Sequence, residues 1–559
     1  MVRMEEGGNL LARRLWKKFE RESVFAKYTP FVVCLASGKL DSNTFRHFLS
    51  QDVHFLRTFK HAYQMAEECA DDEQDRTSIR KLRKRVNRML KTHLSLVPEW
   101  SFQLSQEEEK EEEEYGSTPT SATLKYTDFL MATASGKVGG NLLTPFERTK
   151  VSAYTLAAMA PCISLCAYIS KEIQGFLGPH NGTNHIYKKW VDNYCSLEFE
   201  AEAKEMEEML DGLSVSLTGE ELGLIEKLYH QAMKLELDFF YAQPIVEQTV
   251  VPLSRKAKCG LTIFSDFDLT CTAFDSSAIL AEIAIVTAPK AADPHTQLSR
   301  MSKADLRNTW SLLSTQYAEE YEQCIENILS YEKVETFNYE VLCKALQQIA
   351  DFEKNANLRV IQSGVLKGLN LEDIRRAGQS LILQDGCRDF FQKVVDDENL
   401  KSDVHVISYC WCGDLIRSAF TSGNLDVIKV HSNELAYEES ISTAKIVRKL
   451  ESPMEKLQVL IDILKDRSNS EQHLTVYIGG SVGDLLCLLE ADIGIVMGAT
   501  SSLMKLGDQF GVSFVPLFSG LVEKQRELAK AGSFDWKGLP GTLYTVSSWA
   551  EIEAFILAA

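Results

Sequence analysis

The sequence lacks a hydrophobic run long enough to cross a membrane. Its most apolar stretch, Leu156 to Ile169, is shorter than the roughly 20 residues that a transmembrane helix needs. The first residues contain two early glutamates and no apolar signal-peptide core. These absences predict a cytoplasmic protein with no membrane partner. A longer precursor with a transit peptide would be compatible with a mitochondrial form.

A recognisable cysteine framework is also missing. The 13 cysteines are spread along the chain. Cys162 and Cys166 lie four residues apart and Cys410 and Cys412 lie two apart, but no second pair completes a zinc-binding pattern. We therefore interpret the cysteines as reduced thiols of the kind found in the cytosol, without a disulfide scaffold.

Positive charge is in short supply, because the chain has a formal net charge of −19. An acidic chain repels phosphate backbones, so nucleic acid is not expected as a partner, whereas a small anionic substrate remains possible. With 559 residues, 45% hydrophobic and 25% charged, the composition is that of a globular protein with two to four domains. We find no internal repeat.

The first part of the chain, residues 1–245, is predicted to be an all-helical domain. Apolar residues recur at three-and-four spacing in the segments 9–23, 41–70 and 219–243. No alternating run predicts a strand there. Residues 105–121 hold a run of glutamates followed by small residues, which is typical of a solvated loop between helices.

The pattern changes after Pro244, and residues 246–259 are predicted to be a linker. Short apolar runs then alternate with helical segments, which predicts an α/β domain with a parallel sheet over residues 260–559. The expected strands are 260–266, 403–408, 474–480 and 492–498. The mostly helical stretch at about 276–384 is too long for a simple crossover and is interpreted as a helical cap over a site.

Two aspartates follow the first expected strand, in the sequence FSDFDLT. Asp266 stands at the strand end, and Asp268 leans toward the same side in extended backbone. A divalent cation would relieve the repulsion between the carboxylates and keep Asp266 ionised as a nucleophile. Asp268 could protonate the leaving oxygen. Taken alone, this spacing could also be an incidental acidic turn.

Three further residues stand where a parallel sheet places its chemistry. Ser408 ends a strand and could hold phosphate oxygens, or could be a plain helix cap. Lys456 lies near a helix start and could balance Asp266 and phosphate, or could be a surface lysine. Asp484 could supply an oxygen to Mg²⁺, or could favour a helix dipole. The order of the four signals favours the chemical interpretation of all of them.

Together these motifs resemble the haloacid-dehalogenase (HAD) superfamily of phosphatases over about residues 259–559. The resemblance implies an aspartyl-phosphate intermediate and a Mg²⁺ held by Asp266, the backbone carbonyl of Asp268, and Asp484. Gly480 stands where that family often has an aspartate, so Asp484 would carry the metal directly or through water. Asp492 is interpreted as structural.

The sequence SYCWCGDLI places Trp411 beside the expected phosphate site. Its indole could stack on a flat or cationic substrate ring, or could pack in the core under the cap. The neighbouring Cys410 and Cys412 are interpreted as packing residues.

In the helical half, Asp52, Cys162 and Glu236 lie on apolar faces of three different segments and could form a bundle-core pocket. Cys162 would be a nucleophile served by two carboxylates, although a buried structural thiol and two paired acids would give the same pattern.

The words FLSQD, AAMAPC and ELDFF resemble the TenA family, whose members have an all-helical haem-oxygenase-like fold and hydrolyse aminopyrimidines. The resemblance makes Cys162 the nucleophile, Glu236 its acid–base partner and Asp52 the binder of the pyrimidine amino group. Tyr126 and Phe239 would line the pocket. Phe55 and Cys166 replace tyrosines that are frequent in that family.

A TenA-like half fused to a HAD phosphatase resembles the plant bifunctional thiamin-salvage proteins. This resemblance implies a magnesium-dependent hydrolysis of thiamin monophosphate together with an aminopyrimidine aminohydrolase. From the residues alone we reach only a small phosphomonoester. Two alternatives stay open: a different phosphomonoester as substrate, and a helical half that is a non-catalytic binding or oligomerisation module, compatible with a homo-oligomer.

Overall fold

The structure is a computed structural model. It describes residues 10–558 apart from 100–117, 145–146, 148, 182–184, 256–259, 289–299, 422–424, 467–472, 532–535 and 537–539. Most of the glutamate-rich segment 105–121 and the end of the expected linker 246–259 therefore lie outside the described residues. The chain divides into two compact units, one made of residues 1–252 with 521–532 and 558–559, the other of residues 253–520 with 533–557.

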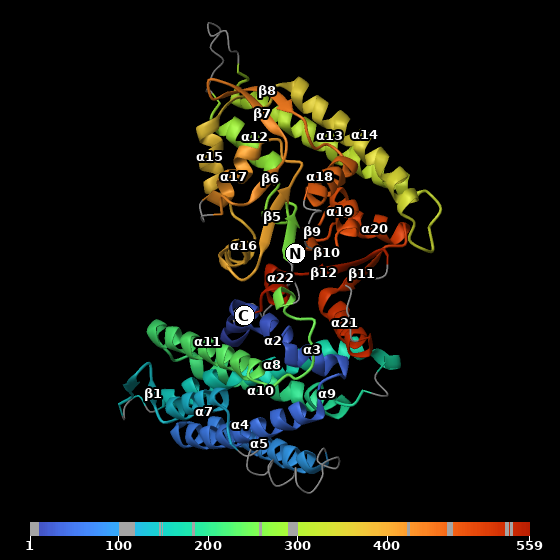
Figure 1. Ribbon diagram of the computed structural model, residues 1–559. Coiled ribbons are helices and arrows are strands. Elements are labelled where there is room, and N and C mark those ends of the chain that lie inside the picture. The colour runs from blue at the N-terminus through green and yellow to red at the C-terminus, as the bar shows by residue number, and fades with distance from the viewer. Residues whose placement is uncertain are drawn as a thin grey trace. The chain divides into compact units, whose positions relative to one another are not determined.

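The first unit is built from helices, as the apolar periodicity predicts (Figure 1). The helices pack around one large apolar core that includes Leu15, Phe59, Leu130, Leu156 and Leu228. Its helices are α1 (Leu11–Lys18), α2 (Glu20–Lys27), α3 (Pro30–Ser37), α4 (Ser42–Cys69), α5 (Glu73–Glu99), α7 (Ser121–Ala134), α8 (Lys150–Asn181), α9 (Lys188–Tyr194), α10 (Leu197–Ser214) and α11 (Gly219–Tyr241).

Local capping sets where the two site-bearing helices begin. The Asp41 side chain accepts hydrogen bonds from the amides of Asn43 and Thr44 at the start of α4. At the start of α11, Thr218 and Glu221 form a reciprocal capping box. A small hairpin of β1 (Lys137–Val138) and β2 (Asn141–Leu142) interrupts the helices, and the sequence pattern did not predict it because each strand has only two residues.

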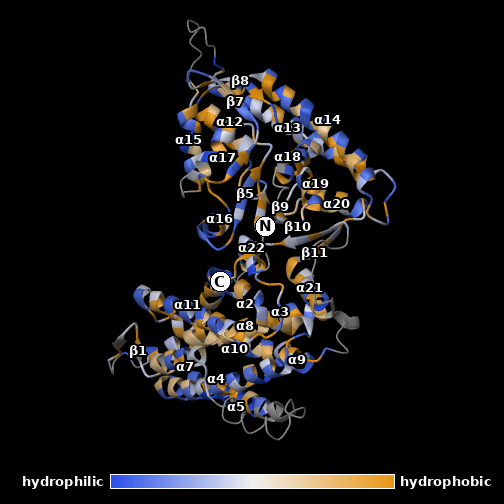
Figure 2. Ribbon diagram, viewed as in Figure 1, coloured by the Kyte–Doolittle hydropathy of each residue, from blue (hydrophilic) through white to orange (hydrophobic). Residues whose placement is uncertain are grey.

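Helix α8 is predominantly apolar, whereas α4 and α11 carry hydrophilic and hydrophobic residues together (Figure 2). The apolar part of α8 is longer than the sequence pattern suggested: by length and composition, residues Lys150–Leu177 would suffice to cross a membrane. About 67% of its most apolar window is buried inside the protein. A core helix of a helical bundle has the same properties, which is the simpler account of this one.

The second unit contains a seven-stranded parallel sheet in the order β11-β12-β10-β9-β3-β5-β6 (Figure 1). The predicted α/β class and the four predicted strands are confirmed. They correspond to β3 (Leu261–Ser265), β5 (Ser402–Ile407), β9 (Leu474–Gly479) and β10 (Ile493–Met497). The pattern missed the two edge strands, β6 (Lys429–His431) and β11 (Ser513–Pro516), which are short and partly exposed. It also missed β12 (Thr542–Val546), which lies between β11 and β10.

Burial explains why the central strands could be recognised. All five residues of β3 and of β10 are buried, as expected for strands covered on both faces. The apolar side chains of these strands and of the neighbouring helices form one core, which includes Phe264, Tyr477, Val496 and Leu503. The remaining helices of this unit are α15 (Leu371–Gln379), α16 (Cys387–Asp396), α17 (Gly413–Thr421), α18 (Pro453–Asp466), α19 (Leu485–Glu490), α20 (Ser501–Gln509) and α22 (Trp549–Ile556), with the 3-10 turns η2 (Leu253–Arg255) and η3 (Val482–Asp484). Helix α21 (Leu517–Ala531) begins in this unit, and its residues from 521 onward belong to the first.

The insertion after β3 is dominated by α12 (Ser276–Val286), α13 (Lys303–Leu329) and α14 (Tyr339–Ser363). Helices α13 and α14 run beside each other, and Leu342 and Ile325 join them to the core of the unit. The insertion is not wholly helical, since β4 (Lys367–Asn370) pairs with β8 (Ile441–Val447), which in turn pairs with β7 (Glu434–Glu438). Helical periodicity could not reveal this sheet because its partner strand lies about 70 residues away.

Candidate active sites

The four sequence signals of the second unit meet at one end of the parallel sheet. Strand β3 ends at Ser265, so Asp266 follows it directly, and Ser408 follows β5 in the same way. Lys456 lies in the first turn of α18, and Asp484 lies in η3, after β9. The carboxyl ends of neighbouring parallel strands lie on one edge, which is why residues more than 200 positions apart come together.

Lys456 joins two of the carboxylates. Its ammonium lies 3.0 Å from Oδ1 of Asp266 and 2.6 Å from Oδ1 of Asp484. The lysine side chain is fully buried and also lies over the Tyr409 ring, 4.8 Å from its centre. Burial alone would lower the pKa of Lys456, but the carboxylates of Asp266 and Asp484 outweigh it and hold the pKa above its ordinary value. The lysine is therefore a permanent cation.

Both oxygens of the Asp484 carboxylate accept several hydrogen bonds. Its Oδ1 accepts from Lys456 and from the Tyr477 hydroxyl at 2.8 Å, and its Oδ2 accepts from the amides of Gly480 and Ser481 and from the Ser481 hydroxyl. Burial raises the pKa of Asp484, but Lys456 and the hydrogen bonds from Ser481 lower it by more. The net pKa therefore lies below its ordinary value. Asp484 is a fixed anion.

Asp266 lines a cavity, and the two oxygens of its carboxylate differ. Its Oδ1 accepts from the Phe267 amide at 2.8 Å and from Lys456, whereas its Oδ2 has no hydrogen-bond partner among the described residues. Burial and the nearby charges of Asp484 and Asp268 raise the pKa of Asp266 well above its usual range, against the opposing effect of Lys456. An added cation would favour the ionised form.

Asp268 is oriented for proton transfer. Its carboxylate accepts from the amide of Ser276 at 2.7 Å, the hydroxyl of Ser276 at 3.1 Å and the hydroxyl of Ser408 at 3.2 Å. Burial, with a further contribution from Asp275, raises the pKa of Asp268 to about 7. A group with such a pKa can give and take a proton at neutral pH.

Ser408 lies beneath the cavity and does not line it. Its hydroxyl donates to Asp268 and accepts from the Cys410 amide at 3.0 Å. In this structure Ser408 therefore positions the carboxyl of Asp268, and the predicted contact with phosphate stays a prediction. Cys410 and Cys412 are buried, as packing residues are, and every cysteine in the described part of the chain is a free thiol.

The side chains of Asp266, Asp268 and Asp484 have different surroundings, and the predicted ligand set of these three residues stays a prediction. Among the described residues, no group of three or more His, Cys, Asp or Glu side chains is arranged to hold a metal ion. The physical reason is that Asp484 already accepts five hydrogen bonds and the carboxylate of Asp268 is turned toward Ser276 and Ser408. Of the three, only Asp266 keeps an oxygen without a hydrogen-bond partner among the described residues.

The space around Gly480 is too small for the aspartate that the family often has at this position. A Cβ atom built on this residue would lie 2.1 Å from the carbonyl oxygen of Met497. Backbone cannot yield as a flexible side chain can, so any side chain at position 480 would force β9 and β10 apart. The departure from the family pattern is therefore a packing requirement of this chain.

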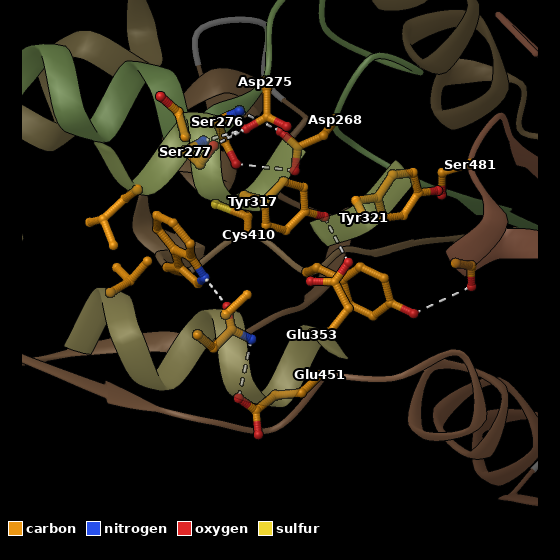
Figure 3. A pocket seen from close by; sticks show the side chains of 18 of the residues that line it. Asp268, Asp275, Ser276, Ser277, Tyr317, Tyr321, Glu353, Cys410, Glu451 and Ser481 are labelled. Atoms are coloured by element: carbon orange, nitrogen blue, oxygen red, sulfur yellow. Dashed lines mark hydrogen bonds between the residues drawn. The ribbon is translucent and has the colours of Figure 1, made fainter. Parts of the chain in front are cut away.

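A cavity of about 330 Å³ opens above Asp266 and Asp268. Its walls come from the strand ends and from α12, α13 and α14 of the insertion, so the predicted cap does cover the candidate site (Figure 3). Trp411 lines this cavity, and its indole donates to Asn357 Oδ1 at 2.9 Å. The indole is half-buried. It packs against the protein and also lines the cavity, so the structure is compatible with both roles that the sequence left open.

In the first unit, Tyr126, Cys162 and Glu236 lie together in the helical core. The Tyr126 hydroxyl donates to Oε1 of Glu236 at 2.6 Å, and the Cys162 thiol is also hydrogen-bonded to Glu236. Burial raises the pKa of Glu236 to about 7, although both hydrogen bonds oppose the shift. Hydrogen bonding to Cys166 and burial raise the pKa of Cys162 well above its ordinary value, so the resting residue is a thiol.

Asp52 faces the same place from α4. Oδ2 of Asp52 lies 3.1 Å from Nε2 of His93, whose other ring nitrogen is 2.9 Å from the Met89 carbonyl. The pKa of His93 is lowered by burial but raised more by Asp52, with a net upward shift. This histidine was missed in the sequence, because one histidine on a basic amphipathic helix gives no signal of its own.

Asp52, Cys162 and Cys166 line a narrow cavity of about 30 Å³, space for a water or two. Phe239 is not part of its lining and packs instead in an aromatic cluster with Phe48 and Phe55. A pyrimidine ring would require neighbouring side chains to move.

The chain was compared with known proteins. Residues 25–244 match the model of the TENA/THI-4/PQQC family. The bifunctional TH2 protein, mitochondrial, of Arabidopsis thaliana is 58% identical, and the match covers 98% of this chain and 89% of that protein. The chain belongs to the bifunctional TH2 protein family. The two-part resemblance predicted from the motifs is thereby confirmed.

Other relatives of this TH2-family chain each cover less than half of it. An aminopyrimidine aminohydrolase of Halalkalibacterium halodurans is 24% identical over 211 residues, which are 38% of this chain and 85% of that protein. Among solved structures, a TenA family transcription regulator from Silicibacter sp. TM1040 has a TM-score of 0.34 at 22% identity, covering 42% of this chain and 97% of that one. A phospho-aspartyl intermediate analogue of phosphoserine phosphatase has a TM-score of 0.27 at 16% identity, covering 44% and 91%.

Proposed function

We propose that the second unit is a phosphomonoesterase that forms an aspartyl-phosphate on Asp266. The observation that carries this proposal is that Asp266 lines a cavity and keeps Oδ2 without a hydrogen-bond partner among the described residues, while Lys456 holds Oδ1. A carboxylate held in this way can attack phosphorus, and the lysine balances the charge that develops. Asp268 gives its proton to the leaving alcohol and then takes one from the attacking water.

A magnesium ion fits this site with fewer protein ligands than the sequence predicts. Mg²⁺ takes one or two protein carboxylates together with substrate phosphate and water. Asp266 Oδ2 and the main-chain carbonyl of Asp268 would hold it, while Asp484 acts through Lys456. When bound, the ion neutralises phosphate charge and keeps Asp266 ionised. We expect EDTA to abolish phosphate release and added Mg²⁺ to restore it.

Thiamin monophosphate is the proposed substrate, because the chain belongs to the bifunctional TH2 protein family and combines a TenA-type half with the phosphatase site. The test is phosphate release from this ester by the full chain. Asp266→Asn should reduce the release by at least ~10⁴-fold, since an amide cannot form the covalent intermediate. Circular dichroism should show that the variant folds. Retained turnover in a folded variant would contradict the assignment of Asp266.

A second activity is favoured by the group formed by Cys162, Glu236 and Tyr126, and by the relative named aminopyrimidine aminohydrolase. In this proposal Glu236 takes the proton of Cys162, and the thiolate adds to the pyrimidine ring while Asp52 binds the amino group on that ring. The C–N bond of the ring's aminomethyl group then breaks, and ammonia leaves with the proton held by Glu236. Water adds to the methylene carbon, and the thiolate is expelled. The net reaction uses water and releases ammonia. Ammonia release from an aminopyrimidine should stop in Cys162→Ser.

We also propose that a form of this protein acts in mitochondria, since the Arabidopsis relative is named as mitochondrial. Fractionation of cells that carry a tagged full-length gene product tests this location. Recovery of the tagged protein only in the cytosol would contradict it.

A further inference from the structure

The cavity above Asp266 is larger than a phosphate group needs and continues into the cap. At about 330 Å³ it has room for a drug-sized organic group. The strand ends form one end of it, and side chains of α13 and α14 form the other. Any alcohol attached to a phosphate on Asp266 would therefore lie against these two helices.

Aromatic rings dominate this cap end. The rings of Tyr317 and Tyr321, both on α13, lie parallel with their centres 6.0 Å apart. Trp310 of α13 contacts Trp411 edge-on, with ring centres 6.4 Å apart. All four residues line the cavity. Flat aromatic faces of this kind bind flat rings, and they bind cations more tightly than neutral groups.

A carboxylate stands among these rings. Glu353 of α14 lines the cavity, and its Oε1 accepts from the Tyr317 hydroxyl at 2.7 Å (Figure 3). Its Oε2 has no hydrogen bond or ion pair to any residue that the structure describes. Asp275 and Glu451 also line the cavity; Glu451 is ion-paired with Arg448 at 3.4 Å, so Asp275 is the one that adds negative charge.

The arginine that lines this end of the cavity is already ion-paired. Arg359 lines the cavity, but its guanidinium lies 2.6 Å from Glu320. Asn357, which separates Trp411 from Glu451, is neutral and hydrogen-bonded to both. Burial raises the pKa of Glu353 to about 7, so a bound cation would favour its ionised form, whereas an anionic alcohol would be disfavoured beside Glu353 and Asp275.

We propose that this end of the cavity is a subsite for the alcohol half of the substrate. In it, Glu353 and the rings of Tyr317, Tyr321, Trp310 and Trp411 select phosphate esters whose alcohol carries a flat, positively charged ring. The subsite rests on the proposed phosphatase function of Asp266. It adds a recognition role for residues that take no part in the chemical steps.

The test compares two esters on the full chain with Mg²⁺: thiamin monophosphate, which carries a cationic ring, and p-nitrophenyl phosphate, whose ring is neutral. Glu353→Gln keeps the shape and the hydrogen bond from Tyr317 but removes the charge. We expect the KM for thiamin monophosphate to rise about tenfold, equivalent to about 1.4 kcal/mol, with kcat little changed. The KM for p-nitrophenyl phosphate should change less than about twofold.

Glu322→Gln is the matched control, because Glu322 is an exposed carboxylate on α13 outside the cavity. It should leave both esters unaffected. A second readout needs no variant: the N-methylated cation of 3-pyridinemethanol should inhibit hydrolysis of p-nitrophenyl phosphate competitively and more strongly than its uncharged parent, at mildly alkaline pH.

Equal loss on both esters, no loss on either, or equal inhibition by the two alcohols would overturn the subsite while leaving the phosphatase in place. A wild-type chain that releases phosphate from neither ester would instead overturn the proposed function, and the subsite with it.

Discussion

At the scale of single residues, the phosphatase site depends on how buried charges share their partners. Lys456 lies between Asp266 and Asp484, and only Asp266 keeps an oxygen without a hydrogen-bond partner among the described residues. Asp484 is therefore best described as the residue that fixes the lysine. Asp268 has a different environment, made of hydroxyl and amide donors, and this difference separates its role from that of Asp266.

Replacing Asp268 with asparagine should slow phosphate release without preventing binding. The amide cannot protonate the leaving alcohol, so kcat should fall by about 10²–10⁴-fold for an alkyl phosphate. For p-nitrophenyl phosphate, whose leaving group needs less protonation, the loss should be smaller. Steady-state kinetics on both esters check this. An equal loss on both would argue against Asp268 as the acid.

The pH dependence of ammonia release should report Glu236. Its pKa is raised to about 7, mainly by burial, and the proposed mechanism needs its ionised form to accept the Cys162 proton. Activity should therefore rise with pH through about 7 and fall about tenfold per unit below it. A kcat/KM profile from mildly acidic to mildly alkaline pH measures this. A profile without that inflection would show that another group governs the step.

The sequence could place Asp266 because an apolar strand of five buried residues leads straight to it. It could not place Glu353 or His93. Each lies on a long amphipathic helix where many positions look alike, and only packing against other elements brings it to a site. For Asp484 the spacing predicted a metal role, direct or through water, but it could not show which donors already occupy the oxygens of this residue.

At the scale of elements, the turn after β9 sets the geometry of the phosphatase site. Gly480 allows β9 and β10 to approach while its amide donates to Asp484. The four central strands were predictable from burial, whereas the β4-β8-β7 sheet joins segments distant in sequence and has no local signal. The cap was predictable as an insertion, but its mixed composition was not.

Restoring the common family residue with Gly480→Asp should damage the protein and leave metal affinity unimproved. The new Cβ would lie 2.1 Å from the Met497 carbonyl, so the strands must shift at a cost of about 1–3 kcal/mol or more. The melting temperature of the second unit should fall, and titration with Mg²⁺ should show no gain in affinity.

Gly223→Ala serves as the control, since a Cβ there meets nothing within 4 Å and the position lies inside α11. It should keep or slightly raise stability. A Gly480→Asp protein that melts normally and binds Mg²⁺ more tightly would contradict this account of the turn.

At the scale of the whole molecule, the chain consists of two compact units with separate cores and separate candidate sites. Residues Asp52, Cys162 and Glu236 belong to the first unit, and Asp266, Lys456 and Asp484 to the second. Since each site is complete within its own unit, neither proposed reaction needs a residue from the other.

The two activities should therefore be separable by single substitutions. Cys162→Ser should abolish ammonia release and leave the rate of phosphate release within about twofold, and Asp266→Asn should do the reverse. Both reactions are measured on the same purified full-length variants. Loss of both activities in either folded variant would show that the units depend on each other.

The cavity floor and roof come from different stretches of the chain, the floor from the strand ends and the roof from the α13–α14 pair. In the proposed subsite, most of the residues that select the ester belong to α13 and α14, whereas the residues that cleave it follow the strands. Exchanging that helical hairpin would re-target the enzyme while its cleavage chemistry stayed the same, which gives a ready starting point for engineering new specificities.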